Sequence, residues 1–437
     1  MDVRSQLEGK KVTVMGLGLL GRGVGDARYL AEQGAELIVT DLKTEEELSG
    51  SLQQLSEFSN ITYVLGEHCL EDFQDRDFIL KAAGVPLDSL YVQEAESHHI
   101  PIKMSASWFM ELAGIPVIGV TGTRGKSTCT HMIHAILQAA EVPVLLGGNV
   151  RGVSTLALLD EVTAEHRALF ELDSWQCQGF GDEKMSPQIA VFTTLLPDHM
   201  NYYKDDMEVY LRDKANIFLY QKPEDALVLG SQCSEVVVDA YGERMVGKKM
   251  VASEHDVPDD WQLKIPGLHN RYDAGLALAA ARVLGISDEI SRKALELFAG
   301  VPGRLELVRT VNGVDFYNDT TATTPDATRA ALRALPPGRV VLIMGGADKG
   351  LDMNELLAEI PTLTKGVVLL AGTGTDRIKT EIPNATIYDS VSDAVQAAVK
   401  IAEEGDVVVL SPAFASFGMF KNEYDRGDQF TAIVTHL

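Results

Sequence analysis

Apolar runs and segments of helical period alternate along the whole chain. Short uninterrupted runs of β-branched and other apolar residues are typical of parallel strands that are buried on both faces. We expect such strands at 11–16, 35–41, 77–84, 116–122, 167–173, 189–195, 226–230, 313–319, 339–346, 366–374, 385–389 and 406–413. Their alternation with helical segments predicts an α/β fold with mostly parallel sheets.

Two breaks in this pattern divide the chain. One lies near 105–116, just before a glycine loop, and the other lies in a Gly- and Pro-containing stretch at 297–306. A chain of 437 residues is also too long for one ordinary core. We therefore expect a Rossmann-like domain at 1–108, a central domain of the P-loop ATPase type at 109–299, and a Rossmann-like domain at 300–437.

Composition narrows the class of protein. Hydrophobic residues make up 46% and charged residues 23% of the chain, as in a well-packed globular protein. The formal net charge of −25 argues against binding to nucleic acid or to an anionic membrane surface. The cysteines have no metal-ligand spacing, no basic-then-apolar leader opens the sequence, and no run approaches the ~18 apolar residues of a membrane span. We expect a cytoplasmic protein with reduced thiols.

The first glycine loop has the spacing of a dinucleotide site. Gly16, Gly18 and Gly21 follow an expected strand, and Asp41 ends the next one. Glycines at these points let the backbone approach a pyrophosphate at a helix N-terminus. Three interpretations stay open for this loop: an NAD-dependent oxidoreductase, a nucleotide-sugar site, or a tight turn with no ligand.

The second glycine loop, "TGTRGKST", is a shortened P-loop. Gly122 and Gly125 are separated by two residues, where the full pattern has four. The working part remains: backbone N–H groups around a phosphate, Lys126 for the phosphate oxygens, and a hydroxyl of Ser127 or Thr128 for Mg²⁺. We expect this loop to bind ATP.

Polar residues follow neighbouring strands of the central part. Glu171 ends one apolar run, and Asp198 and His199 come shortly after another. The carboxyl ends of parallel strands are where open α/β sheets bind ligands, and Mg²⁺ beside ATP takes one or two carboxylates. A solvated glutamate and a structural loop histidine are the alternatives.

Lys214 has an unusual place for a lysine. It falls on the same helical face as Leu211, Ala215 and Phe218. Its amine either snorkels out to solvent, as the sequence alone favours, or is carbamylated by CO₂ and becomes an anionic metal ligand.

A series of motifs in one order resembles the Mur ligase family, and most closely its glutamate-adding branch. The motifs are "GLGLLG", "TGTRGKST", "LLGGN", "FELDSWQ", "PDHMNYY", "RDKANIF", "GLHNRYDA", "VPGRLE", "YNDTTAT", "GGADKG" and "SPAFASFGMFKNEYDRGDQF". The resemblance covers essentially the whole chain.

The resemblance implies an ATP-dependent ligase that adds D-glutamate to UDP-N-acetylmuramoyl-L-alanine in peptidoglycan precursor synthesis. The carboxylate of the acceptor would attack the γ-phosphate of ATP to give an acyl phosphate. The glutamate amine would then attack that carbonyl, with loss of phosphate. The first glycine loop would hold the UDP of the acceptor and the second would hold ATP. The resemblance implies ATP and two Mg²⁺ ions as cofactors, and we expect a monomer whose partners are its small-molecule substrates.

The resemblance also assigns residues to each ligand. The UDP acceptor takes Gly18, Leu19, Leu20, Asp41, Leu42, Lys43 and Asn149. ATP takes Gly122, Thr123, Arg124, Gly125, Lys126, Ser127, Thr128, His269, Asn270, Arg304 and Asp319. Glutamate takes Thr323, Lys349, Ser416, Phe417 and Tyr424. Lys126, Glu171, His199 and Lys214 would be catalytic, with Ser127 and Glu171 on one metal ion, and His199 and a carbamylated Lys214 on the other.

Four positions depart from the usual motifs of the family. Thr321 stands where a lysine is usual, Gly303 replaces a histidine, and Asp173 and Asp273 are added acids. Loss of the lysine leaves open a ligase that adds L-glutamate or another amino acid to the same acceptor. The NAD-dependent oxidoreductase and a non-catalytic nucleotide-sugar sensor are the alternatives from other classes.

Overall fold

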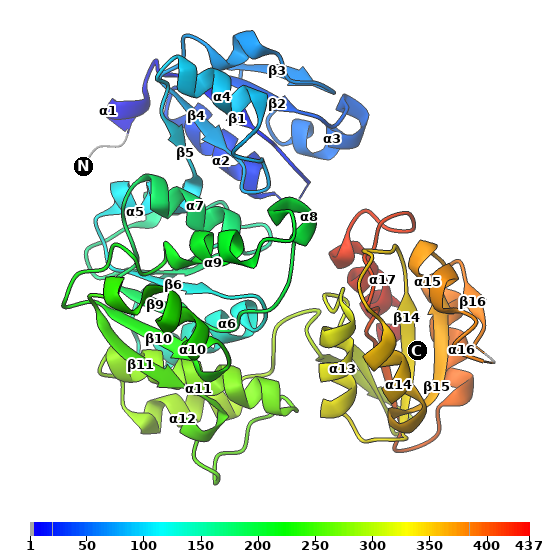
Figure 1. Cartoon of the computed structure of the whole chain (residues 1–437). Coiled ribbons are helices and arrows are strands. Elements are labelled where there is room, and N and C mark those ends of the chain that lie inside the picture. Colours follow the sequence, from blue (N-terminus) through cyan, green and yellow to red (C-terminus); the bar gives the residue numbers. More distant parts are fainter. Residues whose placement is uncertain (1–3, 20, 384) are drawn as a thin grey trace. The chain divides into compact units, whose positions relative to one another are not determined.

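The computed structural model describes residues 4–19, 21–383 and 385–437. Its strands form three separate sheets, of five, six and six strands (Figure 1). The chain divides into two compact units, one made of 1–257 and 273–294, the other of 258–272 and 295–437. The first unit contains two of the sheets and the second contains the third. The predicted α/β class is confirmed.

The N-terminal sheet is parallel throughout, in the order β3-β2-β1-β4-β5. Its strands are β1 (Lys11–Met15), β2 (Glu36–Asp41), β3 (Ile61–Leu65), β4 (Phe78–Lys81) and β5 (Ile102–Lys103). Its helices are α1 (Arg4–Leu7), α2 (Arg22–Glu32), α3 (Glu45–Gln53), η1 (Leu70–Phe73) and α4 (Leu90–Ser97). Alternate residues of the central strands feed two cores, one on each face, with Val14 in one and Met15 in the other.

The central sheet is also parallel throughout, in the order β11-β10-β9-β6-β8-β7. Its strands are β6 (Val117–Thr121), β7 (Val144–Gly148), β8 (Arg167–Glu171), β9 (Ile189–Phe192), β10 (Ala226–Gly230) and β11 (Lys248–Ala252). The helices of this part of the chain are α5 (Ser105–Ala113), α6 (Lys126–Ala139), η2 (Ala157–Glu161), α7 (Ser174–Asp182), α8 (Met200–Tyr203), α9 (Met207–Ala215), α10 (Ser231–Tyr241), η3 (Gly242–Arg244), η4 (Glu254–Asp256), α11 (Leu268–Val283) and α12 (Asp288–Leu297).

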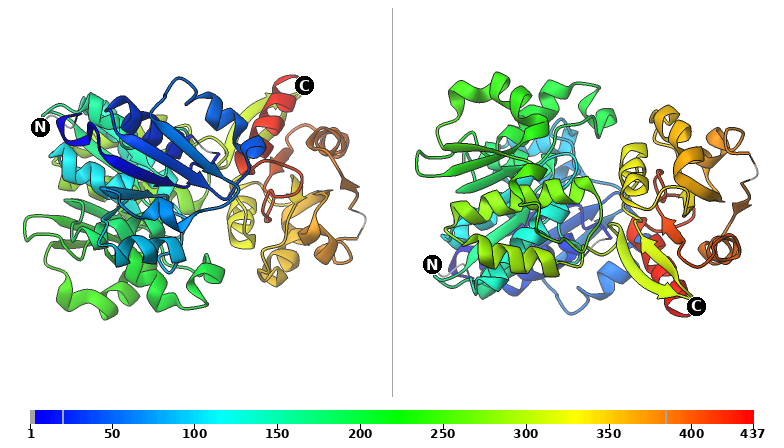
Figure 2. Two further views of the ribbon diagram at one scale, coloured as in Figure 1. Left: turned by 90° about the horizontal axis from the view of Figure 1, so that it is seen from above. Right: turned by 90° about the horizontal axis from the view of Figure 1, so that it is seen from below.

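The third sheet has the order β12-β13-β17-β14-β15-β16, with one antiparallel pair, β12 with β13. Its strands are β12 (Glu306–Val311), β13 (Val314–Asn318), β14 (Val340–Gly345), β15 (Thr364–Leu370), β16 (Ile387–Tyr388) and β17 (Val407–Leu410). Its helices are α13 (Pro325–Ala334), α14 (Asn354–Leu363), α15 (Thr373–Ile378), α16 (Val391–Ile401) and α17 (Glu423–Thr435). Helices lie along both faces of this sheet (Figure 2).

Every strand expected from the sequence is present, and five further strands are β3, β5, β7, β11 and β12. Each of these five lies at an edge of its sheet. The expected boundary after residue 108 falls within α5, and the three-domain division at 108 and 299 stays a prediction. No helix in the described part of the chain is long and apolar enough to cross a membrane.

Candidate active site

The second glycine loop curls between β6 and α6, as its spacing predicts. Gly122 and Gly125 have φ values of +144° and +85°, in the region that side chains disfavour. A Cβ on Gly122 would lie 2.0 Å from Thr193 Oγ1, and one on Gly125 would lie 2.2 Å from Asp273 Oδ1. Both glycines are therefore required for the loop to close in this form. Asp273, one of the four departures, packs directly against this loop.

Two lysine ammonium groups converge on this loop. Lys126 Nζ donates to the carbonyl oxygens of Gly122 at 3.0 Å and Thr123 at 3.1 Å. Lys214 Nζ donates to the same Gly122 oxygen at 2.8 Å. Burial and the neighbouring charge of Lys214 lower the pKa of Lys126. Two cations that share one neutral acceptor form a site for an anion.

Lys214 lies in the core and does not snorkel. It is 1% exposed, and its ammonium lies 4.8 Å from the centre of the Tyr210 ring. Leu211, Ala215 and Phe218 are buried beside it, as the helical pattern predicts, so the snorkelling interpretation is wrong. Burial lowers the pKa of Lys214 to about 8. About a quarter of the amine is then neutral near pH 7.5, and the neutral amine is the form that reacts with CO₂.

Glu171 and Asn149 lie at the same edge of the central sheet as the phosphate loop. β8 lies between β6 and β7, so Glu171, at the end of β8, has the loop after β6 on one side and Asn149, after β7, on the other. Glu171 is 3% exposed, and Asn149 Nδ2 approaches its Oε1 at 3.5 Å. Glu171 forms no ion pair with any residue that the structure describes. A buried carboxylate that forms no ion pair among the described residues, beside a phosphate loop, fits Mg²⁺.

Asp198 and His199 follow β9 at this edge. Burial alone would raise the pKa of Asp198, but the Arg124 guanidinium, 2.7 Å away, holds that pKa well below its usual range. His199 has a left-handed backbone, with φ 54°, and its ring centre lies 4.5 Å from that of Trp175. Burial lowers the pKa of His199, which favours the neutral imidazole that binds metals.

The donor set for metal is sparse. The described residues contain no group of three or more His, Cys, Asp or Glu side chains placed to hold an ion. Mg²⁺ in nucleotide sites keeps waters and takes phosphate oxygens, with only one or two protein carboxylates. Glu171 with Ser127, which is 6% exposed at the start of α6, fits that pattern for one ion. A second ion would need the anionic form of Lys214 beside His199.

In the first glycine loop, Asp41 bonds to the loop itself. Its Oδ2 accepts from the N–H groups of Leu17 and Gly18 at 2.9 and 3.0 Å, and its Oδ1 accepts from Lys43 N at 2.9 Å. A dinucleotide site of the usual kind needs this carboxylate for the ribose hydroxyls. Here both oxygens are engaged by backbone, which argues against NAD and makes Asp41 a support of the loop.

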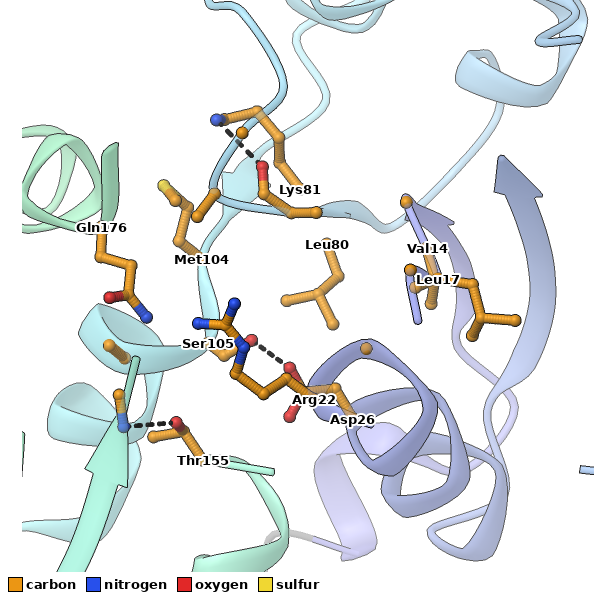
Figure 3. Close-up of a pocket in the computed structure, with 18 of the residues that line it drawn as sticks. Val14, Leu17, Arg22, Asp26, Leu80, Lys81, Met104, Ser105, Thr155 and Gln176 are labelled. Carbon is orange, nitrogen blue, oxygen red and sulfur yellow. Dashed lines mark hydrogen bonds between the residues drawn. The ribbon is translucent and has the colours of Figure 1, made fainter. Parts of the chain in front are cut away.

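The remaining residues predicted for UDP surround this loop. Leu19 and Leu42 expose 44% and 66% of their surface, which leaves two apolar side chains for a ligand to cover. Leu20 lies outside the described residues. A cavity of about 230 Å³ opens between the loop, the end of β4 and the start of α5 (Figure 3).

The second compact unit holds its own group of predicted residues. His269 and Asn270 lie in the first turn of α11, where burial lowers the pKa of His269 and Asn270 Nδ2 donates to Pro266 O at 2.6 Å. Asp319 follows β13 and accepts from Leu305 N at 3.0 Å and Ser411 Oγ at 2.7 Å. Burial raises the pKa of Asp319 to about 7, and the charge of Arg304 opposes that rise.

Of the five residues predicted to bind glutamate, two are in direct contact. Lys349 Nζ donates to Thr323 Oγ1 at 2.9 Å, which brings two of the five together. The loop before Ser416 is tied to the loop of Lys349 by the pairing of Ala415 with Ala347. Ser416 is 3% exposed, whereas Phe417 is 68% exposed.

Two of the departures from the family motifs are in contact. Thr321 donates from its backbone N–H and from its hydroxyl to Gly303 O, at 3.1 and 2.9 Å. Gly303 has φ +73°, and a Cβ there would lie 3.0 Å from Thr320 Cγ2. The threonine that replaces the usual lysine is thus held by the glycine that replaces the usual histidine.

Sequence reasoning missed Arg426. This side chain is 0% exposed and forms no ion pair in the described part of the chain. It donates to Thr320 O at 2.8 Å, to Thr320 Oγ1 at 3.1 Å and to Phe414 O at 3.3 Å. Arg426 thereby joins the loop of Thr321 and Thr323 to the loop of Ser416. Arg426 lies within the motif "SPAFASFGMFKNEYDRGDQF", but the resemblance assigned it no role.

Three family models match consecutive parts of the chain. "Mur ligase MurD-like, N-terminal domain" matches residues 10–103, "Mur ligase middle domain" matches 120–262, and "Mur ligase, glutamate ligase domain" matches 303–414. The fold agrees. The UDP-N-acetylmuramate-alanine ligase MurC from Thermotoga maritima aligns with a TM-score of 0.63 at 17% identity, over 98% of this chain and 99% of that chain. The MurF ligase from Thermotoga maritima in complex with ADP aligns with a TM-score of 0.60 at 16% identity, over 99% and 97%. The fold and the site together define a Mur-type ligase.

Curated relatives narrow this class. A UDP-N-acetylmuramoylalanine--D-glutamate ligase from Roseiflexus sp. (strain RS-1) is 38% identical, over 98% of this chain and 99% of the relative. Proteins of the same name from Borreliella burgdorferi (strain ZS7) and Streptococcus suis (strain 98HAH33) are 33% and 34% identical, over 97% and 99% of this chain and 97% and 98% of the relatives. The chain belongs to the Mur ligase family, and within it to the group of the UDP-N-acetylmuramoylalanine--D-glutamate ligases. The family resemblance is confirmed, and the oxidoreductase alternative receives no support from these relatives.

Proposed function

We propose that this chain catalyses ATP-dependent addition of D-glutamate to UDP-N-acetylmuramoyl-L-alanine, through an acyl phosphate, in peptidoglycan precursor synthesis. The observation that carries this proposal is the pair of amines at the phosphate loop. Lys126 and Lys214 both donate to Gly122 O, and the buried carboxylate of Glu171 lies at the same sheet edge. In a chain with net charge −25, Lys126 is a local cation suited to an anion, whereas the buried amine of Lys214 is the group proposed to be carbamylated.

Different residues of the central site have different proposed roles, in binding phosphate and in binding metal. Lys126 and the N–H groups of the loop would hold the β- and γ-phosphates of ATP, while Ser127 and Glu171 would hold one Mg²⁺. His199 and Lys214 in its carbamylated form would hold a second Mg²⁺. Metal ions bound there would supply charge neutralisation beside the γ-phosphate. Arg124 keeps Asp198 ionised and in place beside His199.

The acceptor and the amino acid would be bound by separate sets of residues. The first glycine loop, with Leu42 and Lys43, takes the UDP, and Asn149 takes the part of the acceptor nearest Glu171. Lys349, Thr323, Ser416, Phe417 and Tyr424 take the two carboxylates of glutamate. By the family resemblance, His269, Asn270, Arg304 and Asp319 would also contact ATP. We further propose a cytoplasmic monomer with domains at 1–108, 109–299 and 300–437.

A second candidate substrate rests on Thr321. The family lysine at this position is replaced by a threonine whose hydroxyl is bonded to Gly303 O, so it supplies no cation to an amino acid. L-glutamate or another amino acid on the same acceptor therefore remains a candidate.

One assay separates these possibilities. Phosphate release is measured with ATP, the UDP-muramoyl-alanine acceptor and each enantiomer of glutamate in turn. Release that requires the acceptor and D-glutamate supports the proposal, and release with the L-enantiomer alone supports the second candidate. ATP hydrolysis at the same rate with and without the acceptor would refute both candidate functions.

A further inference from the structure

The cavity beside the first glycine loop contains a cation that no prediction assigned. It is lined by the loop itself, by residues of β4, α5 and β7, and by the first turns of α2. Its charged lining residues are Arg22, Asp26 and Lys81. Figure 3 shows the guanidinium of Arg22 projecting from the first turn of α2 into this space, on the side of Gln176.

Two of the three charged groups are engaged elsewhere. Asp26 accepts from the hydroxyls of Ser105 and Ser154 and from Leu156 N, which occupies both of its oxygens. Lys81 Nζ donates to the backbone oxygens of Val85 at 2.9 Å and Ala82 at 3.4 Å. Arg22 is then the charged group of the lining that still faces the cavity with donors to offer.

The donors of Arg22 are mostly unused. A guanidinium carries five N–H groups. Arg22 Nη1 donates to Asn149 Oδ1, and Arg22 forms no ion pair with any residue that the structure describes. A fork of N–H groups with this geometry is suited to two oxygens of a phosphate.

The glycine loop uses two of its backbone donors within the protein. Leu17 and Gly18 both donate their N–H groups to Asp41. Arg22 is the first residue of α2, an eleven-residue helix, so its charge adds to the positive end of the helix dipole. An anion in the cavity would interact with the Arg22 charge and with the positive end of the α2 dipole. The N–H groups of Leu17 and Gly18 already donate to Asp41.

We propose that Arg22 binds the diphosphate of the UDP-linked acceptor. This inference rests on the proposed function, because it presupposes a nucleoside diphosphate at the first loop. Asn149 bonds to Arg22 on one side and approaches Glu171 on the other. The same guanidinium therefore also positions Asn149 between the diphosphate and the carboxylate that is proposed to hold Mg²⁺.

The test compares UDP with uridine, which lacks the diphosphate, by isothermal titration calorimetry on the full chain. R22Q should weaken UDP about ten- to a hundredfold, as expected for hydrogen bonds to a charged group, and should leave uridine within about threefold. ADP affinity should be unchanged, because ADP binds at the second loop. The matched control is R28Q, which removes the same charge from the same helix, where Arg28 pairs with Glu57 at 2.9 Å. R28Q should leave UDP and uridine unchanged.

R22K separates recognition from support of the fold. It keeps the charge but loses the fork, so it should retain the wild-type melting temperature and lose part of the preference for UDP over uridine. Equal weakening of UDP and uridine in R22Q, or unchanged UDP affinity in both variants, overturns the inference while leaving the proposed function standing. A wild-type chain that binds UDP no better than uridine overturns the nucleoside-diphosphate site and with it both proposals.

Discussion

Replacing Asp319 by Asn should stabilise the second compact unit more at pH 7 than at pH 5, relative to the wild type. Asp319 is 8% exposed, and burial raises the pKa of its carboxyl group from 3.8 to about 7. The unfolded chain therefore ionises this group at a lower pH than the folded chain does. Between these two values the folded state binds the extra proton, so the stability of the wild type falls as the pH rises through this window.

The magnitude follows from the two pKa values. At 1.36 kcal/mol per pKa unit, the cost of ionising Asp319 in the folded chain is about 4 kcal/mol by pH 7, and about 2 kcal/mol of it arises between pH 5 and pH 7. Asparagine keeps the contacts, because its oxygen can accept from Leu305 N and its amide can donate to Ser411 Oγ. The hydroxyl of Ser411 can still donate to Thr328 Oγ1, 3.1 Å away.

Differential scanning calorimetry at pH 5, 6 and 7 would measure the effect. A change of about 2 kcal/mol corresponds to a shift of roughly 4–8 °C in the transition of a unit of this size. The matched control is D315N in β13, the strand that Asp319 follows, where Asp315 accepts from Thr310 Oγ1 at 2.6 Å. A difference between D319N and the wild type that is equal at all three pH values would show that Arg304 keeps Asp319 ionised, and would refute the reasoning.

Three further predictions follow from single contacts. K214A should lose most activity and recover part of it with a short-chain carboxylic acid, because the acid replaces a carbamate; full activity of K214A in bicarbonate-free buffer would contradict this. K349A should raise the KM for glutamate about ten- to a hundredfold and change the ATP KM far less, as expected for the loss of a charged hydrogen bond; the reverse pattern would assign Lys349 to the nucleotide. G303A should lower the melting temperature more than G338A does, because both glycines have φ +73° but only Gly303 would bring a Cβ to 3.0 Å from Thr320. Equal shifts in the two alanine variants would mean that the backbone strain alone matters.

The central strands could be predicted because their environment is uniform. In a parallel sheet the inner strands are buried on both faces, so each one reads as an apolar run, as β14 does with all six residues buried. The five strands that the pattern missed lie at sheet edges. An edge strand has a neighbouring strand on one side only, so its residues need not all be apolar. β11 begins with two exposed lysines, and β12 alternates between exposed and half-buried residues. Polarity at an edge also protects it against pairing with other chains.

Some residues of the site could also be predicted from the sequence, and others could not. Lys126 and Glu171 could be predicted because a parallel sheet brings the residues at its strand ends to one edge, whereas Asn149 was assigned by the family resemblance alone. The roles of Asp41, Arg22 and Arg426 could not, because each depends on a partner distant in the sequence: Asp41 on the N–H groups of Leu17 and Gly18, Arg22 on Asn149, and Arg426 on Thr320 and Phe414.

The sequence by itself determined the α/β class, the two glycine loops and the order of the family motifs, since apolar runs, glycines and catalytic side chains are local properties of a chain. Only the tertiary structure decided that Lys214 is buried with its ammonium on Gly122 O, that Asp41 bonds to its own loop, and that Thr321 is held by Gly303. The physical reason is that burial and hydrogen bonding depend on which segments pack together. A lysine on an apolar helix face has the same sequence whether it reaches solvent or a carbonyl oxygen, and only the packed fold removes one of those choices.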